Sequence, residues 1–370
     1  MLLSKLPPGM RYYLGAEARL RRSVEDVAMA VFEGWSYEEV LTPSVDYYTL
    51  FEQGMGSTEA QTSFRFTDTD GRMLSLRPDV TSSVARVAAT LLAERERPLR
   101  LCYAAPVFRQ QQQSHAEWRR ENTQVGCELI GVGGNSADLE VLLLAAEILN
   151  RIGLTEKFCV TINDVQILNG LIANLKLDQN SRETLRRLID TRDASHLSRF
   201  LDEQSLSNSV REPLIHLTQL TGKRQVLDEA RGSIQNETSL AAIEKLSNLW
   251  QVIESLGMAD SFEIDLADVS SLDYYTGLSF KVFVRGAGYR VGRGGRYDSL
   301  SESFGKNEPA VGFVLNLDSL VEVLGREVSA NGGNGKATHT IVAEDVAATF
   351  AEAIKRRMNN EQIRIQFKAL

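Results

Sequence analysis

The chain has 370 residues, of which 43% are hydrophobic and 24% are charged, which excludes a disordered protein and suits one large domain with smaller attachments. Its formal net charge of -8 argues against a general affinity for nucleic acid, because phosphate backbones attract basic surfaces. The longest apolar run, Val141 to Ala146, is far shorter than the roughly 20 residues of a membrane span, and the N-terminus has no apolar leader. We therefore expect a cytoplasmic protein.

The cysteines and histidines indicate neither disulfide nor metal chemistry. The three cysteines are odd in number and widely spaced, which is typical of reduced thiols, and the four histidines are scattered as well. Neither residue type forms the close pairs that zinc sites use. We expect no metal site and no cofactor.

The first predicted elements are a helix and a strand. Apolar side chains recur at helical spacing over residues 15–32, so an amphipathic helix begins the fold and ends near Gly34. A strand over residues 37–41 follows, and Pro43 closes it because proline cannot continue a central ladder. Further strands are predicted over residues 73–76, 99–107 and 124–132, with helices between them.

The second half of the chain predicts a helical insertion and a short tail. Residues 165–258 are polar and helical in pattern, without strand-like alternation, so they interrupt the sheet. Residues 330–336 are typical of a flexible linker before a βαβ-sized tail. The sequence thus predicts an α+β core domain over residues 1–328, built on an antiparallel sheet, and a linker with a truncated α/β segment over residues 329–370. Strands resume over residues 279–284, 289–292 and 310–315.

Three residues of one predicted strand form a candidate ligand face. Gln124, Gly126 and Glu128 alternate with apolar neighbours, so the period of two places their side chains on the same side of the sheet. A glycine between two long polar side chains leaves space for a small ligand, and an amide with a carboxylate can bind an ammonium or imidazole N–H group. On the pattern alone, a half-solvated strand is the more frequent explanation.

Asp79 and Thr81 lie between a predicted strand and a predicted helix. Both residue types cap the first turn of a helix, and capping alone accounts for them. A carboxylate at the carboxyl end of a strand can also bind the amino group of a ligand. The pattern of these two residues leaves both interpretations open.

Two further groups could recognise a ligand but have ordinary explanations too. Tyr274 and Tyr275 precede a strand, where paired tyrosines more often pack than recognise. Arg109 follows a strand and could bind a carboxylate or phosphate, or form a surface ion pair. The glycine-rich run over residues 292–298 fits neither common phosphate-binding pattern.

Taken together, these segments resemble the class II histidyl-tRNA synthetase family from about Leu6 to Leu324. The resemblance implies that family's α+β fold, with an antiparallel sheet flanked by helices. It rests on blocks that occur in the family's order: Leu6–Met10, the motif 1 segment Gly34–Pro43, the motif 2 segment Phe108–Glu128, the histidine-specific block Leu272–Gly277, and the approach to motif 3 at Gly294–Asp298 and Pro309–Phe313.

The resemblance also implies a histidine pocket. Arg109 falls on the motif 2 arginine, which in the family faces the ligand carboxylate and the nucleotide's α-phosphate. Asp79 stands where synthetases usually have Glu. The family's histidine-contacting positions fall on Asp79, Thr81, Gln124, Glu128, Tyr274 and Tyr275.

The chain departs from the family at positions that serve ATP. Ser270 stands where synthetases carry an arginine that supports adenylate formation, and Ser319 stands where the motif 3 arginine stacks on ATP. Gln110–Gln113 replaces charged residues of the motif 2 loop. Losing one preorganised positive group typically lowers a rate about 10²–10³-fold. Only roughly forty residues follow the last motif, too few for a complete anticodon-binding domain. We expect neither ATP activation nor tRNA binding.

This combination is similar to a paralogous family, the regulatory subunits of ATP phosphoribosyltransferase. The resemblance implies a non-catalytic self-dimer that joins short-form catalytic subunits into a hetero-oligomer, a hetero-octamer. It implies that the subunit is required for their activity in the first step of histidine biosynthesis and mediates feedback inhibition by histidine. It implies no catalytic residue in this chain, and the short apolar runs predict no membrane contact. An active histidyl-tRNA synthetase and a stand-alone histidine-sensing or RNA-binding paralogue stay open as alternatives.

Overall fold

The computed structural model describes residues 5–56, 60–110, 119–204, 206–269, 275–330, 338–342 and 345–366. The chain divides into two compact units, Met1–Val323 and Leu324–Leu370. Among the described residues, no helix is long and apolar enough to cross a membrane. Within the same residues, no cluster of three or more His, Cys, Asp or Glu side chains could hold a metal ion.

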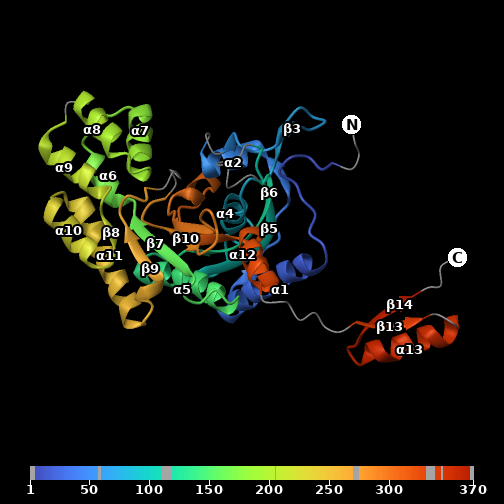
Figure 1. Cartoon of the computed structure of the whole chain (residues 1–370). Coiled ribbons are helices and arrows are strands. Elements are labelled where there is room, and N and C mark those ends of the chain that lie inside the picture. Colours follow the sequence, from blue (N-terminus) through green and yellow to red (C-terminus); the bar gives the residue numbers. More distant parts are fainter. Residues whose placement is uncertain are drawn as a thin grey trace. The chain divides into compact units, whose positions relative to one another are not determined.

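A nine-stranded mixed sheet forms the centre of the first unit (Figure 1). Its strands run in the order β1-β5-β6-β12-β11-β10-β7-β9-β8. The pairs β1·β5 and β7·β9 are parallel, and the other neighbours are antiparallel, so the predicted α+β fold is confirmed. The strands are β1 Glu38–Glu39, β5 Leu99–Phe108, β6 Glu121–Ile130, β7 Phe158–Asp164, β8 Thr221–Gly222, β9 Phe262–Asp265, β10 Leu278–Val284, β11 Gly292–Arg296 and β12 Ala310–Asn316.

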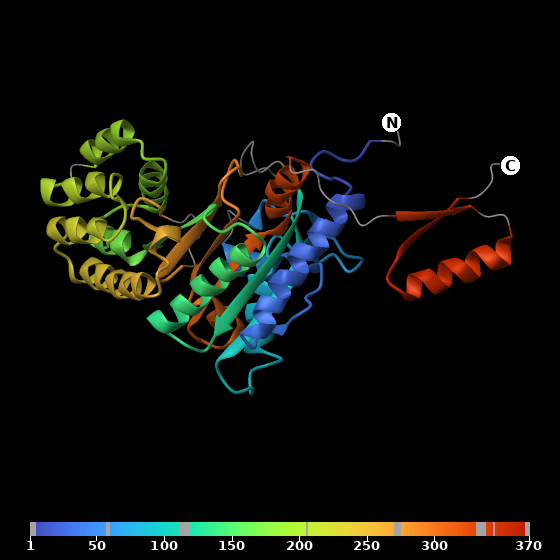
Figure 2. The ribbon, with the colours of Figure 1, turned by 60° about the horizontal axis from the view of Figure 1, so that its bottom comes forward.

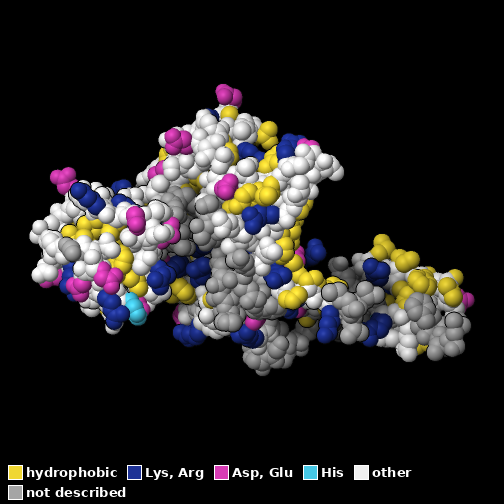
Figure 3. All heavy atoms as spheres, turned by 90° about the horizontal axis from the view of Figure 1, so that it is seen from above, with side chains coloured by type: hydrophobic (Ala, Val, Ile, Leu, Met, Phe, Trp, Pro, Cys, Tyr) yellow, Lys and Arg dark blue, Asp and Glu magenta, His cyan; other side chains and the backbone are white. Residues whose placement is uncertain are grey.

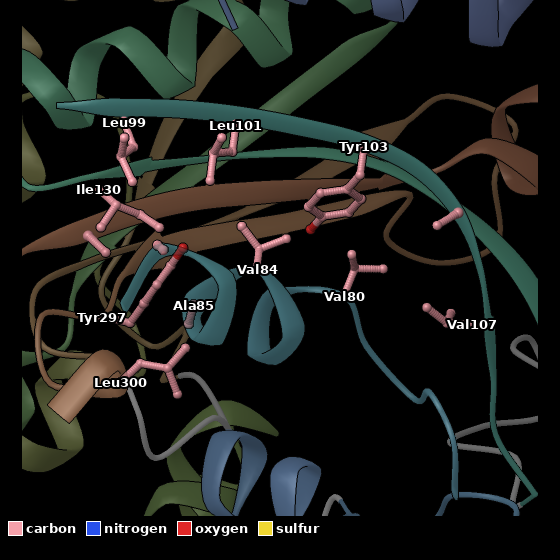
Figure 4. Packing of buried hydrophobic residues seen from close by; sticks show 13 residues of the cluster. Val80, Val84, Ala85, Leu99, Leu101, Tyr103, Val107, Ile130, Tyr297 and Leu300 are labelled. Carbon is pink, nitrogen blue, oxygen red and sulfur yellow. The ribbon is translucent and has the colours of Figure 1, made fainter. Parts of the chain in front are cut away.

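Helices cover both faces of this sheet. The helix α1 (Gly15–Gly34) packs beside α5 (Asn135–Arg151) on one face, where the rings of Phe32 and Phe313 lie 6.0 Å apart (Figure 2). The other face carries α4 (Thr81–Ala89) and the short helix η2 (Leu300–Phe304). Figure 4 shows Val80 and Val84 packed below the strand that carries Leu101 and Tyr103. Burying these apolar side chains fixes α4 against β5.

A smaller sheet lies before α4 in the chain. Its strands run in the order β2-β4-β3 and are antiparallel. The ion pair between Arg86 of α4 and Asp46 of β2 ties this sheet to α4. Its elements are β2 Val45–Tyr47, α2 Tyr48–Met55, β3 Arg65–Thr67 and β4 Met73–Leu76.

The insertion between β7 and β9 is helical, and charged side chains of both signs are interspersed over its surface (Figure 3). The two-residue strand β8 was not predicted, because so short an edge strand has no alternating pattern to recognise. The helices are α6 Gln166–Ile172, α7 Gln179–Asp190, α8 Ala194–Glu203, α9 Asn208–Leu217, α10 Gln225–Ser233 and α11 Glu237–Ser255, followed by η1 Ala259–Ser261.

The second unit contains a parallel strand pair and one helix. The strands β13 (Thr338–Val342) and β14 (Gln362–Gln366) pair in parallel, and α13 (Val346–Met358) connects them. The helix α12 (Leu317–Ala330) precedes them. The linker predicted over residues 330–336 lies outside the described residues except for Ala330.

One predicted strand was wrong in its position. We expected a strand over residues 289–292, but β11 spans Gly292–Arg296. Three of its five residues are glycines, which strand propensity disfavours. The packing requires them, because a Cβ on Gly292 would lie 2.5 Å from the Leu315 side chain and 2.8 Å from the Val314 carbonyl oxygen. Close tertiary packing therefore overrides local propensity here.

Candidate functional site

A cavity of about 330 Å³ opens on the sheet face that α4 covers. Its walls come from β6, β11, β12 and the first residues of α4. The antiparallel register places Glu128 opposite Gly312, and Gly312 opposite Gly295. Since paired residues on neighbouring strands point to the same side, these three strands present one common face to the cavity.

Glu128 is the most buried acidic group of the cavity, with 1% of its surface exposed. Its Oε1 accepts hydrogen bonds from the Thr81 hydroxyl at 2.8 Å and the Tyr103 hydroxyl at 3.0 Å. The Tyr297 hydroxyl donates to Oε2. Three hydroxyl donors from three separate elements thus hold one carboxyl group in place.

The environment of Glu128 changes its acidity. Burial raises the pKa of Glu128 to about 7, and the charge of Asp79 adds to the rise, while the three hydroxyl donors oppose it. The carboxyl group therefore titrates near neutral pH. A group of this kind can accept a hydrogen bond from an imidazole N–H or share a proton with the ring.

Gly312, which lines the cavity, and Gly295 both leave space that cavity side chains occupy. The Glu128 carboxyl group occupies the space that a Cβ on Gly312 would need. A Cβ on Gly295 would lie 2.8 Å from the ring of Tyr275 and 2.6 Å from the Leu278 carbonyl oxygen. Any larger residue at these positions would displace a side chain that lines the cavity.

Asp79 has a structural role and also faces the cavity. Its Oδ1 accepts hydrogen bonds from the backbone N–H of Ser82 at 3.2 Å and from the Ser82 hydroxyl at 2.9 Å, so it caps the first turn of α4. Burial raises the pKa of Asp79, and the bonds from Ser82 and the positive charges of Arg109 and Arg293 oppose that rise. Both interpretations of this residue, cap and ligand contact, are compatible with its position.

Gln124 lies on the same strand face as Glu128, four residues earlier, and 9% of its surface is exposed. Its Oε1 is buried and has no hydrogen-bond partner among the described residues. A buried amide oxygen without a partner is costly, typically about 1–3 kcal/mol. A ligand N–H group would satisfy it.

The structure brings together most of the residues that the sequence singled out. Arg109 lines a neighbouring cavity of about 370 Å³, and its Nε donates to the Pro78 carbonyl oxygen at 3.4 Å. Tyr274 lies outside the described residues. Those that line the first cavity are Asp79, Thr81, Gln124, Glu128 and Tyr275.

Sequence reasoning missed two polar side chains of the cavity. Arg293 and Tyr297 both line it, and both belong to the glycine-rich run that fitted no phosphate-binding pattern. The available signal was period-two alternation, which would have placed Arg293 and Gly295 on one face of a strand. That signal could not be used because the strand itself was predicted too early in the chain.

Only some of the positions that depart from the synthetase pattern lie among the described residues. Ser319 is buried near the start of α12, and its hydroxyl lies 2.8 Å from the Tyr289 hydroxyl. The backbone N–H of Gln110 donates to the Thr62 carbonyl oxygen at 2.5 Å. Ser270 and the glutamines at 111–113 lie outside the described residues.

Comparisons with known proteins place this fold in a family. The family model described as "Histidyl-tRNA synthetase" matches residues 9–320. A curated relative from Moorella thermoacetica, named ATP phosphoribosyltransferase regulatory subunit, is 36% identical over 95% of this chain and 90% of its own length. A relative of the same name from Desulfitobacterium hafniense is 31% identical over 99% of this chain and 92% of its own length. The chain belongs to the ATP phosphoribosyltransferase regulatory subunit family.

Solved structures agree with membership of the regulatory subunit family. A crystal structure titled ATP phosphoribosyltransferase regulatory subunit/histidyl-tRNA synthetase, from Bacillus halodurans C, has a TM-score of 0.86 at 31% identity and covers 100% of this chain and 94% of its own. Histidyl-tRNA synthetase from Nostoc sp. PCC 7120 has a TM-score of 0.80 at 20% identity over 100% of this chain and 87% of its own, which shows the shared fold. The regulatory subunit family thus has the class II synthetase fold.

Proposed function

We propose that this chain is a non-catalytic regulatory subunit of ATP phosphoribosyltransferase and that histidine is its effector. The two curated relatives named for that role, at 36% and 31% identity, support the first part. The cavity beneath α4 supports the second, because it combines two buried carboxyl groups with a buried amide. The protein would act in the first step of histidine biosynthesis and carry the feedback signal.

The observation that carries the ligand assignment is the pairing of Glu128 with Asp79 in one small cavity. A free histidine offers an imidazole N–H and an ammonium group, both of which donate hydrogen bonds. The Glu128 carboxyl group suits the imidazole, since its pKa near 7 matches that of the ring. Asp79 and Thr81, at the start of α4, suit the ammonium group. Tyr275 would cover the ring from the side of Gly295.

Two substitutions at positions that serve ATP in synthetases support a regulatory role. Adenylate formation needs fixed positive charge on the transferring phosphate, and serine at residues 270 and 319 supplies none. Ser319 is instead paired with Tyr289 in the described structure. Each such loss lowers the rate of adenylate formation, so we propose that the chain neither activates histidine nor charges tRNA.

The effector would act through a partner, the short-form catalytic subunit. In this proposal the chain forms a dimer, and the dimers join catalytic subunits in a hetero-octamer that is active only when assembled. A coupling free energy of about 1–3 kcal/mol between the histidine site and the assembly would give about 5–150-fold control.

The proposal is tested by mixing the purified chain with a short-form catalytic subunit and measuring formation of phosphoribosyl-ATP. We expect activity only in the mixture, and inhibition when histidine is added. Absence of any effect on the catalytic subunit would favour a stand-alone histidine sensor. Histidine-dependent exchange of pyrophosphate with ATP by the chain alone would favour an active synthetase.

A further inference from the structure

Arg293 lines the same cavity as the two acidic residues Asp79 and Glu128. Among the described residues that line it, Arg293 is the only Lys or Arg side chain. It also lines two adjoining cavities of about 370 and 390 Å³. Arg109, which the motif 2 resemblance assigns to the ligand carboxylate, lines one of the adjoining cavities and not the cavity that holds Glu128.

The register of the sheet places Arg293 on the same face as Glu128. Arg293 pairs with Val314, which pairs with Gly126, two residues before Glu128 on β6. Strands lie about 4.8 Å apart and rise about 3.4 Å per residue, so the backbones of Arg293 and Glu128 are about 12 Å apart across two strand spacings and two residues. On the intervening strand β12, the same face carries Gly312, which has no side chain, and Val314, which also lines the cavity. An acid and an arginine at this spacing can bracket a free amino acid.

The two acidic groups of the cavity leave the carboxylate of a ligand without a positive partner unless Arg293 provides one. Two carboxyl groups, Asp79 and Glu128, are the acids among the described residues that line it. Burial raises the pKa of Asp79, and the positive charges of Arg109 and Arg293 lower it by less. A zwitterionic ligand brings a carboxylate as well as an ammonium group. An ionised acid repels that carboxylate, whereas a guanidinium group binds carboxylates with two parallel hydrogen bonds.

We propose that Arg293 binds the carboxylate of the amino-acid ligand and so makes the cavity selective for free amino acids over amines and alcohols of the same side chain. This inference rests on the proposed function, because it assigns a role within the same histidine site. In this arrangement the Arg293 side chain on β11 holds the carboxylate of the ligand.

The test is calorimetric titration of the full chain with L-histidine and with L-histidinol, whose alcohol replaces the carboxylate. The wild-type chain should bind histidine more tightly than histidinol. Arg293→Ala should weaken histidine binding about 10–100-fold, as expected for a charged hydrogen-bonded pair, and leave histidinol binding unchanged or stronger. Arg293→Gln, which keeps most of the side-chain volume, should do the same, and Arg293→Lys should restore part of the preference.

Arg285→Ala is the matched control, because Arg285 is an exposed arginine in the turn that follows β10. It should leave both affinities unchanged. An equal loss of histidine and histidinol binding in Arg293→Ala and Arg293→Gln would overturn the inference, as would loss of the preference in Arg109→Ala but not in the Arg293 variants. If the wild-type chain bound no histidine at all, the proposed function would fail instead, so the two failures are distinguishable.

Discussion

The carboxyl group of Glu128 lies in the space that a side chain at Gly312 would fill. The two residues are direct partners on β6 and β12. The absence of a side chain on Gly312 thus leaves space for the Glu128 carboxyl group, within reach of hydroxyl groups from α4, β5 and the segment after β11. The cavity depends on this arrangement.

We predict that Gly312→Ala destabilises the fold and disrupts the cavity. The added methyl group would displace the Glu128 carboxyl group from its hydroxyl donors, and overpacking of this kind typically costs about 1–3 kcal/mol. Gly133→Ala is the control, since a Cβ there would lie 3.8 Å from the Pro309 side chain, an ordinary contact. Chemical denaturation of both variants checks this. Equal stability of the two would show that Glu128 is not held as described.

The raised pKa of Glu128 predicts how the stability of the fold depends on pH. Its pKa is about 7 in the folded chain and about 4.5 when unfolded, so the folded state retains the proton that the unfolded state loses between these values. Stability should therefore fall as pH rises from about 4.5 to about 7, by on the order of 3 kcal/mol, and no further above that. Below about pH 4.5 this loss of stability is absent, because the carboxyl group is protonated in both states.

Denaturation of the wild type and of Glu128→Gln across a pH range of about 4.5 to 8 isolates the effect. The difference in unfolding free energy between the two proteins should change by on the order of 3 kcal/mol between about pH 4.5 and about pH 7, because Gln does not titrate. Asp79 also has a raised pKa and contributes to the absolute curves, but it contributes to both proteins. Parallel curves for the two proteins would contradict the assignment to Glu128.

Tyr297→Phe tests the hydroxyl donors. The Tyr297 hydroxyl favours the ionised form of Glu128, so its removal should raise the pKa of Glu128 further. The loss of stability should be larger at about pH 8 than at about pH 5 by about 1 kcal/mol, since bonds to charged groups are the stronger ones. Tyr289→Phe, which removes a bond to a neutral serine, should cost the same at both pH values. Identical behaviour of the two variants would exclude the proposed coupling.

The sequence predicted the parts of the fold whose patterns are local. The strand β6 alternates between polar and apolar residues, and its period of two is enough to place Gln124 and Glu128 on one face of the sheet. The helix α1 was predicted from the helical spacing of its apolar side chains, and it begins at Gly15 as expected. Patterns of this kind need no information from distant segments.

The parts that could not be predicted depend on contacts between distant segments. The glycines of β11 are required by Leu315 and Phe280 on the neighbouring strands, which no local propensity reflects. With β11 misplaced, Arg293 could not be assigned to the same face as Glu128. Arg109 lines an adjoining cavity together with Gln124 and Arg293, and its expected role toward the ligand carboxylate stays a prediction.

Histidine inhibition of the reconstituted complex, made with wild-type chain or with Glu128→Ala, tests the central claim most directly. Both chains should activate the short-form catalytic subunit, since Glu128 is buried and cannot contact a partner. The account predicts that histidine inhibits the complex with wild-type chain and leaves the Glu128→Ala complex active. Equal inhibition of both complexes would place the effector site elsewhere and contradict the account.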